Sequence, residues 1–159
     1  MGDYPPLTLP FPDMRDWVFP RILEIRARMH GDRPFIQALG GAALTYAEAD
    51  RLVNRLAHGL AAQGVGPGDR VLVMLPNCVE FMLLWWAINR LGAVEVSVNN
   101  AYKGYFLEHL VSNSGGRLLV AAAEFLDRLA AVEDSCPDLE TVVAWAPHRR
   151  LRGAAGAPR

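Results

Sequence analysis

The chain has 159 residues, a formal net charge of −1 and 52% apolar residues, which suits one globular domain that buries roughly 70% of its unfolded surface. This composition excludes a disordered or strongly polyanion-binding polypeptide. The two cysteines, Cys78 and Cys136, form no Cys-x-x-Cys pattern, so neither a zinc site nor a disulfide framework is indicated.

The amino-terminal segment carries acidic residues and prolines where an export signal needs a basic start and an apolar core. We expect residues 1–14 to form an extended lead-in. The most apolar stretch, "FMLLWWAI" at 81–88, is far shorter than the ~20 residues of a membrane span. We therefore expect no transmembrane segment and a cytoplasmic location.

Helical spacing of apolar residues predicts a first helix over residues 16–29. "RPFIQAL" and "AALTY" on either side of Gly40 and Gly41 predict a β-hairpin. Thr45 and Glu48 have the spacing of a capping box, which predicts a helix over residues 46–63.

Three glycines, Gly64, Gly66 and Gly68, follow this helix at every second position. Phosphate-binding glycines normally follow a strand and open a helix, because the phosphate meets free amides at the helix amino terminus. Here the order is reversed, since a helix ends at Gly64 and a strand begins at Arg70. We interpret the stretch as a helix cap and a turn.

Strands and helices alternate from Arg70 onward. The expected strands are 70–75, 93–98, 117–122 and 139–145, and the expected helices between them are 78–91, 104–115 and 124–135. Asn77 and Glu80 offer a cap for the helix over 78–91, which is apolar nearly all round and should be buried on several sides. The alternation predicts a parallel α/β sheet with right-handed crossovers.

The last residues, 147–159, contain four arginines, no acid and mostly Gly, Ala and Pro. Without interleaved aromatics this composition favours a disordered basic tail over a nucleic-acid-binding segment. The expected organisation is therefore a lead-in over 1–14, one α/β subdomain over 15–146 and a tail over 147–159.

No catalytic, cofactor-binding or metal-binding residue is predicted. The four histidines, His30, His58, His109 and His148, lack the spacing of metal ligands. Glu95 interrupts an apolar strand, which we interpret as a sheet edge rather than a functional carboxylate. The only lysine, Lys103, is not in a glycine-rich loop.

Several short motifs occur in an order that resembles the amino-terminal portion of the AMP-dependent (adenylate-forming) acyl-CoA synthetases. They are "LTY" at 44–46, "GDRV" at 68–71, "LPN" at 75–77 with "EF" at 80–81, and "GA" at 92–93. The resemblance covers residues 15–145, and "NNAYKGYFLEHLVSNSGGRLLV" is most similar to the fatty-acyl and carnitine or crotonobetaine CoA ligase branch. Ser97 and Asn100 depart from the family pattern.

The resemblance implies an α/β fold of partial, Rossmann-like parallel-sheet type with an amino-terminal hairpin. It also implies a reaction in which a carboxylate attacks ATP to give an acyl-adenylate, after which CoA displaces AMP, with Mg²⁺ assisting. The ATP-phosphate loop and the catalytic lysine of the family lie downstream of the matched motifs, so this chain is expected to bind none of these cofactors itself.

Three hypotheses remain open from the sequence. The first is a truncated or frame-shifted ligase that is inactive alone and lacks the remainder of the enzyme. The second is a non-catalytic binding or regulatory module that pairs with a full-length homologue, through the apolar helix at 81–88. The third, a flavodoxin-like nucleotide binder, is disfavoured because no strand is followed by a phosphate-binding loop.

Overall fold

The computed structural model describes Asp13 and residues 18–146. The expected lead-in, apart from Asp13, and the expected tail over 147–159 lie outside the described residues. In chain order the elements are α1 (Phe19–His30), β1 (Pro34–Gln37), β2 (Ala43–Thr45), α2 (Tyr46–Ala62), β3 (Arg70–Met74), α3 (Val79–Arg90), β4 (Val94–Ser97), α4 (Tyr105–Ser114), β5 (Leu118–Ala122), α5 (Leu126–Ala130) and β6 (Thr141–Trp145).

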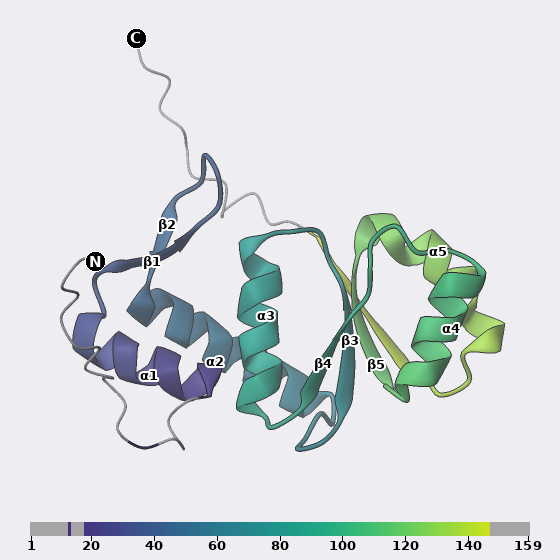
Figure 1. The fold of residues 1–159 in the computed structure, drawn as a ribbon, viewed down its shortest axis with the longest axis horizontal. Helices are drawn as coiled ribbons and strands as arrows, with labels where there is room; N and C mark the ends of the chain where they lie inside the picture. The colour runs from purple at the N-terminus through teal and green to yellow at the C-terminus, as the bar shows by residue number, and fades with distance from the viewer. Residues whose placement is uncertain (1–12, 14–17, 147–159) are drawn as a thin grey trace, which may run out of the picture.

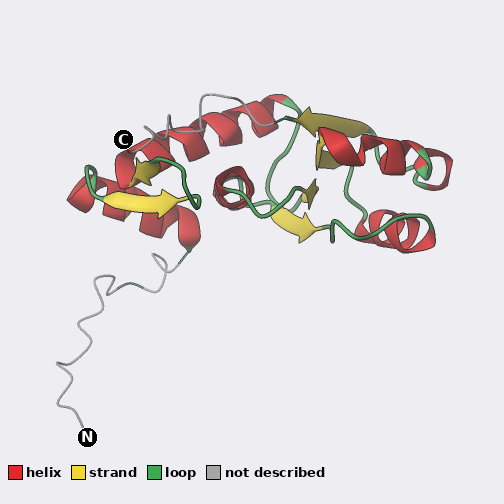
Figure 2. Cartoon of the chain, turned by 90° about the horizontal axis from the view of Figure 1, so that it is seen from above, coloured by secondary structure: helices red, strands yellow, loops and turns green. Residues whose placement is uncertain are grey.

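In Figure 1 the helices α1 and α2 and the hairpin of β1 and β2 lie mainly on one side of α3, and the larger sheet with α4 and α5 lies on the other side. Figure 2 shows this two-stranded sheet on one side of the molecule, apart from the larger sheet. The hairpin is antiparallel, as predicted, and pairs Ile36 with Leu44.

The capping box at the start of α2 is confirmed. The amide of Glu48 donates to Thr45 Oγ1 at 3.2 Å, and the amide of Thr45 donates to Glu48 Oε2 at 2.8 Å. Each partner satisfies one of the amides that an isolated helix start leaves free. The helix boundary predicted from these two residues is therefore correct to within one residue.

The larger sheet has four parallel strands in the order β4-β3-β5-β6. β3 is the first strand of this sheet along the chain, but it lies between β4 and β5. The chain therefore passes from β4 across β3 to reach β5. In Figure 1, α3 covers one face, while α4 and α5 cover the other. All five residues of β5 and four of the five residues of β3 are buried, as expected for strands that are covered on both faces.

The predicted cap of α3 is wrong. The residue at the cap position of α3 is Cys78, which has the extended main-chain conformation of a helix cap, and not Asn77, which precedes it. The side chain of Cys78 makes no capping hydrogen bond. The helix itself is close to its prediction at Val79–Arg90.

The helix predicted over 124–135 is also wrong in extent. Only Leu126–Ala130 is α-helical, with single 3-10 turns at Ala123–Phe125 and Glu133–Ser135. Val132 leaves the helical conformation with φ −122°, and its side chain is buried. Packing of this side chain against the core outweighs the local helical pattern.

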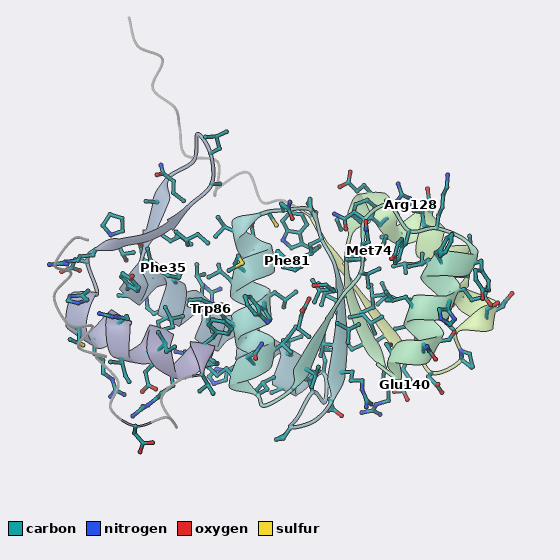
Figure 3. All side chains as sticks on the ribbon, viewed as in Figure 1. Phe35, Met74, Phe81, Trp86, Arg128 and Glu140 are labelled. Carbon is teal, nitrogen blue, oxygen red and sulfur yellow. The ribbon has the colours of Figure 1, made fainter. Side chains whose placement is uncertain are left out.

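The helix α3 packs inside the molecule. Leu83, Leu84, Trp86, Ala87 and Ile88 are buried. Figure 3 shows Trp86 on the side of α3 that faces α1, where its ring lies 5.2 Å from that of Phe35 and 6.0 Å from that of Phe19. Trp86 therefore belongs to the core.

Candidate functional site

The carboxyl ends of the parallel strands are the first place to look for a site. In open α/β sheets ligands bind outside these ends, at the point where the strand order reverses. Here the order reverses between β3 and β5. In Figure 3 this end of the sheet is marked by Met74 and Arg128, and Glu140 lies at the opposite end.

Hydrogen bonds between main chain and side chains tie this end of the sheet together. Asn100 Nδ2 donates to the carbonyl of Leu75 at 2.9 Å, and Arg128 Nη1 donates to the carbonyl of Asn100 at 2.6 Å. The Arg128 guanidinium also lies 5.1 Å from the centroid of the Phe125 ring. These contacts join the segments that follow β3, β4 and β5 by hydrogen bonds within the protein.

Asn99 and Asn100 form an ordered turn in spite of the departure at Asn100 from the family pattern. Asn99 Oδ1 accepts from the amide of Ala101 at 2.9 Å, and the carbonyl of Asn99 accepts from the amide of Tyr102 at 2.9 Å. An asparagine side chain that bonds to the main chain two residues later is typical of such turns.

The glycine stretch between α2 and β3 is a connector, as predicted. The amides of Gly64 and Gly68 donate to the carbonyls of Ala61 and Gly92, each at 2.9 Å, and the amide of Gly66 donates to Asp69 Oδ2 at 2.8 Å. Gly64 and Gly68 have φ of +84° and +82°, which favours glycine. All three amides are occupied by protein acceptors, and one of these is a carboxylate, so the loop does not fit a phosphate.

Glu95 lies on β4, at the edge of the sheet, which confirms the edge interpretation. Its carboxylate is half-buried and accepts from Ser97 Oγ at 2.7 Å. Burial raises the pKa of the Glu95 carboxyl above its ordinary value.

The remaining reactive side chains form no cluster within the part of the chain that is described. No group of three His, Cys, Asp or Glu residues there is arranged to hold a metal ion. Burial raises the pKa of the Cys78 thiol, which makes it a weaker nucleophile at neutral pH. His109 stacks on the ring of Tyr105 at 5.9 Å, and His148 lies outside the described residues.

A groove of about 610 Å³ runs along β6, and no sequence pattern pointed to it. It is lined mainly by apolar side chains from α2, α3, β5 and β6. They include Leu56, Leu60, Leu84, Val120, Val143 and Trp145. Arg55 and Glu80 also line the groove, so charged groups are few there.

Comparison with known proteins shows where this architecture occurs. A family described as "AMP-binding enzyme" matches residues 23–156. The chain belongs to this AMP-binding enzyme family. The match confirms the resemblance to acyl-CoA ligases, and it extends ten residues past the expected subdomain boundary at 146.

Similar curated proteins include CoA ligases. The feruloyl-CoA synthase of an Amycolatopsis species is 40% identical over 107 residues, which cover 67% of this chain and 22% of that protein. The long-chain-fatty-acid–CoA ligase FadD13 of Mycobacterium tuberculosis is 31% identical over 125 residues, which cover 76% of this chain and 25% of that ligase. The chain thus spans about a quarter of the length of these relatives.

Solved structures of other proteins share the fold. The Mycobacterium smegmatis MbtA apo structure has a TM-score of 0.73 and 32% identity, and the similarity covers 91% of this chain and 28% of that one. The putative long-chain-fatty-acid CoA ligase from Rhodopseudomonas palustris has a TM-score of 0.76 at 24% identity, over 88% of this chain and 35% of that one. The predicted α/β fold class is therefore confirmed. No helix in the described part of this family member is long and apolar enough to cross a membrane.

Proposed function

We propose that the chain is the first α/β subdomain of an adenylate-forming acyl-CoA ligase, with residues 15–146 as its folded unit. In this proposal the complete ligase activates a carboxylic acid with ATP and transfers the acyl group to CoA. The chain contributes architecture and no catalytic, cofactor-binding or metal-binding residue. The observation that carries the proposal is the family match over residues 23–156, combined with the short share of each relative that it represents.

The polar groups of the described residues support an architectural role. ATP and Mg²⁺ would need free amide donors or cationic side chains at the phosphates and carboxylates at the metal. The glycine amides are already bonded within the protein, and the polar side chains at the carboxyl end of the sheet join its loops. The amides of Gly64, Gly66 and Gly68 are therefore not free for a phosphate, which supports the proposal.

The acid that such a ligase would activate is proposed only as a class. The relatives above are named for a ferulic acid derivative and for long-chain fatty acids, and the sequence resembles the fatty-acyl and carnitine or crotonobetaine branch. A cytoplasmic location is part of the proposal, supported by two cysteines that are both free thiols.

ATP-pyrophosphate exchange by the purified 159-residue chain tests the proposal. With ATP, Mg²⁺ and either a long-chain fatty acid or ferulic acid, we expect no exchange above the buffer control, while a complete FadD13 assayed in parallel exchanges label. Acid-dependent exchange by the chain alone would show that it holds its own active site and would overturn the proposal.

A further inference from the structure

The edge strand β6 has no feature that prevents it from pairing with a further strand. Its sequence is TVVAW, with no charge, proline or glycine, whereas the opposite edge strand, β4, carries the half-buried carboxylate of Glu95. Within the described residues β6 pairs only with β5. Unpaired main-chain groups along such an edge are a template for a further strand, and proteins commonly cover or blunt them.

The two sides of β6 differ in their chemistry. Val143 is 36% exposed and lines the 610 Å³ groove, which α2 and α3 border with mainly apolar side chains. Val142 is 42% exposed and lines a second groove, of about 320 Å³, on the side of α5. Glu133 and Glu140 line this second groove as well. A segment that covers β6 therefore meets apolar groups on one side and carboxylates on the other.

The segment around α5 carries an excess of negative charge. Arg128 is its only basic residue, and this guanidinium already donates to the carbonyl of Asn100. Among the described residues Glu140 pairs with Arg117 at 3.5 Å, and Glu133 takes part in no ion pair. The acidic residues of this segment are Glu124, Asp127, Glu133, Asp134, Asp138 and Glu140. The α5 side of β6 is therefore complementary to a positively charged partner.

The sequence that follows β6 supplies this positive charge. Residues 147–159, which lie outside the described residues, read PHRRLRGAAGAPR. Arg150, Leu151 and Arg152 alternate, so in an extended strand the two arginines share one face and the leucine takes the other. Pro147 is favoured at the second position of a type I turn, and three-residue loops are common connections in β-hairpins.

The length of the loop decides which side each of these side chains takes. With residues 147–149 as the loop, Leu151 is opposite Trp145 and Arg152 is opposite Ala144. Opposite residues of a hairpin share a face, and Trp145 lines the apolar groove. Leu151 then lies on the side of this groove, and the arginines lie on the side of α5. A shift by one residue would put both arginines over the apolar groove instead.

We propose that residues 150–153 form an antiparallel fifth strand on β6, with Leu151 at the apolar groove and with Arg150 and Arg152 beside the carboxylates around α5. The added strand pairs with the main chain of β6 and so prevents this edge from pairing with another chain. The carboxyl-terminal segment is then a built-in cover and not the disordered tail that its composition suggests. The proposal does not depend on the acyl-CoA ligase reaction.

A second copy of this chain fits the edge less well. Two β6 strands can pair with each other, but each brings the acidic residues around its own α5 to the same joint sheet. Like charges that face one another across strands are destabilising, whereas the arginines of residues 147–159 bring the opposite charge.

Hydrogen exchange of the full 159-residue chain at low salt tests the proposal. We expect amides of residues 150–153 to exchange about tenfold more slowly than in a free peptide of residues 147–159, because a paired strand protects its amides. Exchange at the rate of the free peptide, in a chain that is folded by circular dichroism, would overturn the proposal. Slowing that appears only at high protein concentration, together with dimer formation, would assign the edge to a second copy and would overturn it too.

Two variants with the same change in charge locate the contact. Arg150→Glu combined with Arg152→Glu places carboxylates beside those around α5, and we expect residues 150–153 to lose their slow exchange and residues 141–145 to exchange faster. Arg149→Glu combined with Arg159→Glu changes the proposed loop and the last residue, and we expect it to keep the slow exchange. Equal loss in both variants would mean a general attraction between charges and would contradict a paired strand.

Light scattering measures the consequence of the cover for the whole chain. We expect the wild type and the Arg149→Glu, Arg159→Glu variant to stay monomeric at micromolar concentration, and the Arg150→Glu, Arg152→Glu variant to associate through its open edge. Association of the wild type to the same extent would contradict the protective role. ATP-pyrophosphate exchange is not expected from any of these chains, so this proposal and the proposed function fail separately.

Discussion

At the scale of single residues, Gly116 and Gly59 differ in the space available for a side chain. A Cβ at Gly116 would lie 2.4 Å from Leu72 Cδ1 and 2.8 Å from the carbonyl oxygen of Arg70, whereas a Cβ at Gly59 would meet nothing within 4 Å. Gly116→Ala should destabilise the fold by about 1–3 kcal/mol, because the core strand β3 must shift. Gly59→Ala, inside α2, should stabilise it by about 0.5–1 kcal/mol.

Urea unfolding at neutral pH measures both changes. Since the two substitutions add the same methyl group, their difference isolates the close approach of Gly116 to β3. Equal effects of the two variants would mean that the main chain at Gly116 relaxes without cost.

The carboxyl group of Glu95 should make the stability of the fold depend on pH. Burial raises the pKa of its carboxyl above the ordinary value of 4.5, so the folded state binds the proton more tightly than the unfolded state. This contribution to stability is complete below about pH 4 and is lost as the pH rises through the higher folded pKa. Glu95→Gln should therefore be more stable than the wild type at pH 7 and equally stable near pH 3.5.

Thermal unfolding at the two pH values measures this difference, with Glu124→Gln, at an exposed position, as the matched control. A stability gain in Glu95→Gln that is the same at both pH values would come from side-chain packing and would contradict the assignment to ionisation.

At the scale of elements, Arg90 at the end of α3 holds three helices together. Its guanidinium donates to Asp50 Oδ1 of α2 at 2.9 Å, to the carbonyl of Pro20 of α1 at 3.1 Å, and to Asn54 Oδ1. The side chains of Arg90 and Asp50 are only 18% and 19% exposed. Arg90→Ala should destabilise the fold by about 2 kcal/mol, because partly buried acceptors lose a charged donor.

The exposed ion pair of Arg117 and Glu140 is the matched control. These side chains are 58% and 61% exposed at a separation of 3.5 Å, so Arg117→Ala should cost less than about 1 kcal/mol. Denaturant midpoints of the two variants at one pH make the comparison. A cost at Arg90 as small as that at Arg117 would show that the three helices are held by apolar packing alone.

At the scale of the whole molecule, the order of the strands predicts the order of local stability. β3 and β5 are central and buried, β4 and β6 are edges, and the two-stranded hairpin lies outside the main sheet. Native-state hydrogen exchange of the chain alone should be slowest at residues 71–74 and 118–122, faster at the edge strands and fastest at the hairpin. Slowest exchange in β6 would indicate that its edge is already covered.

Most of the helices and strands of this protein could be predicted from the sequence, because their signals are local. The capping box of Thr45 and Glu48, the alternation after Arg70 and the connector of Gly64 and Gly68 depend on residues a few positions apart. The extent of the helix predicted over 124–135 was wrong, because the main chain leaves the helical conformation at Val132, whose side chain is buried. The capping residue predicted for α3 was one position too early.

The strand order, and the surfaces that follow from it, could not be predicted from local sequence and are seen in the three-dimensional structure. The crossover that takes β5 past β3 places β4 and β6 at the edges, and no local pattern encodes this choice. The groove along β6 combines residues from α2, α3, β5 and β6, up to 90 positions apart between Arg55 and Trp145. The residue types of β6 mark it as apolar, but its position at an edge is a property of the whole sheet.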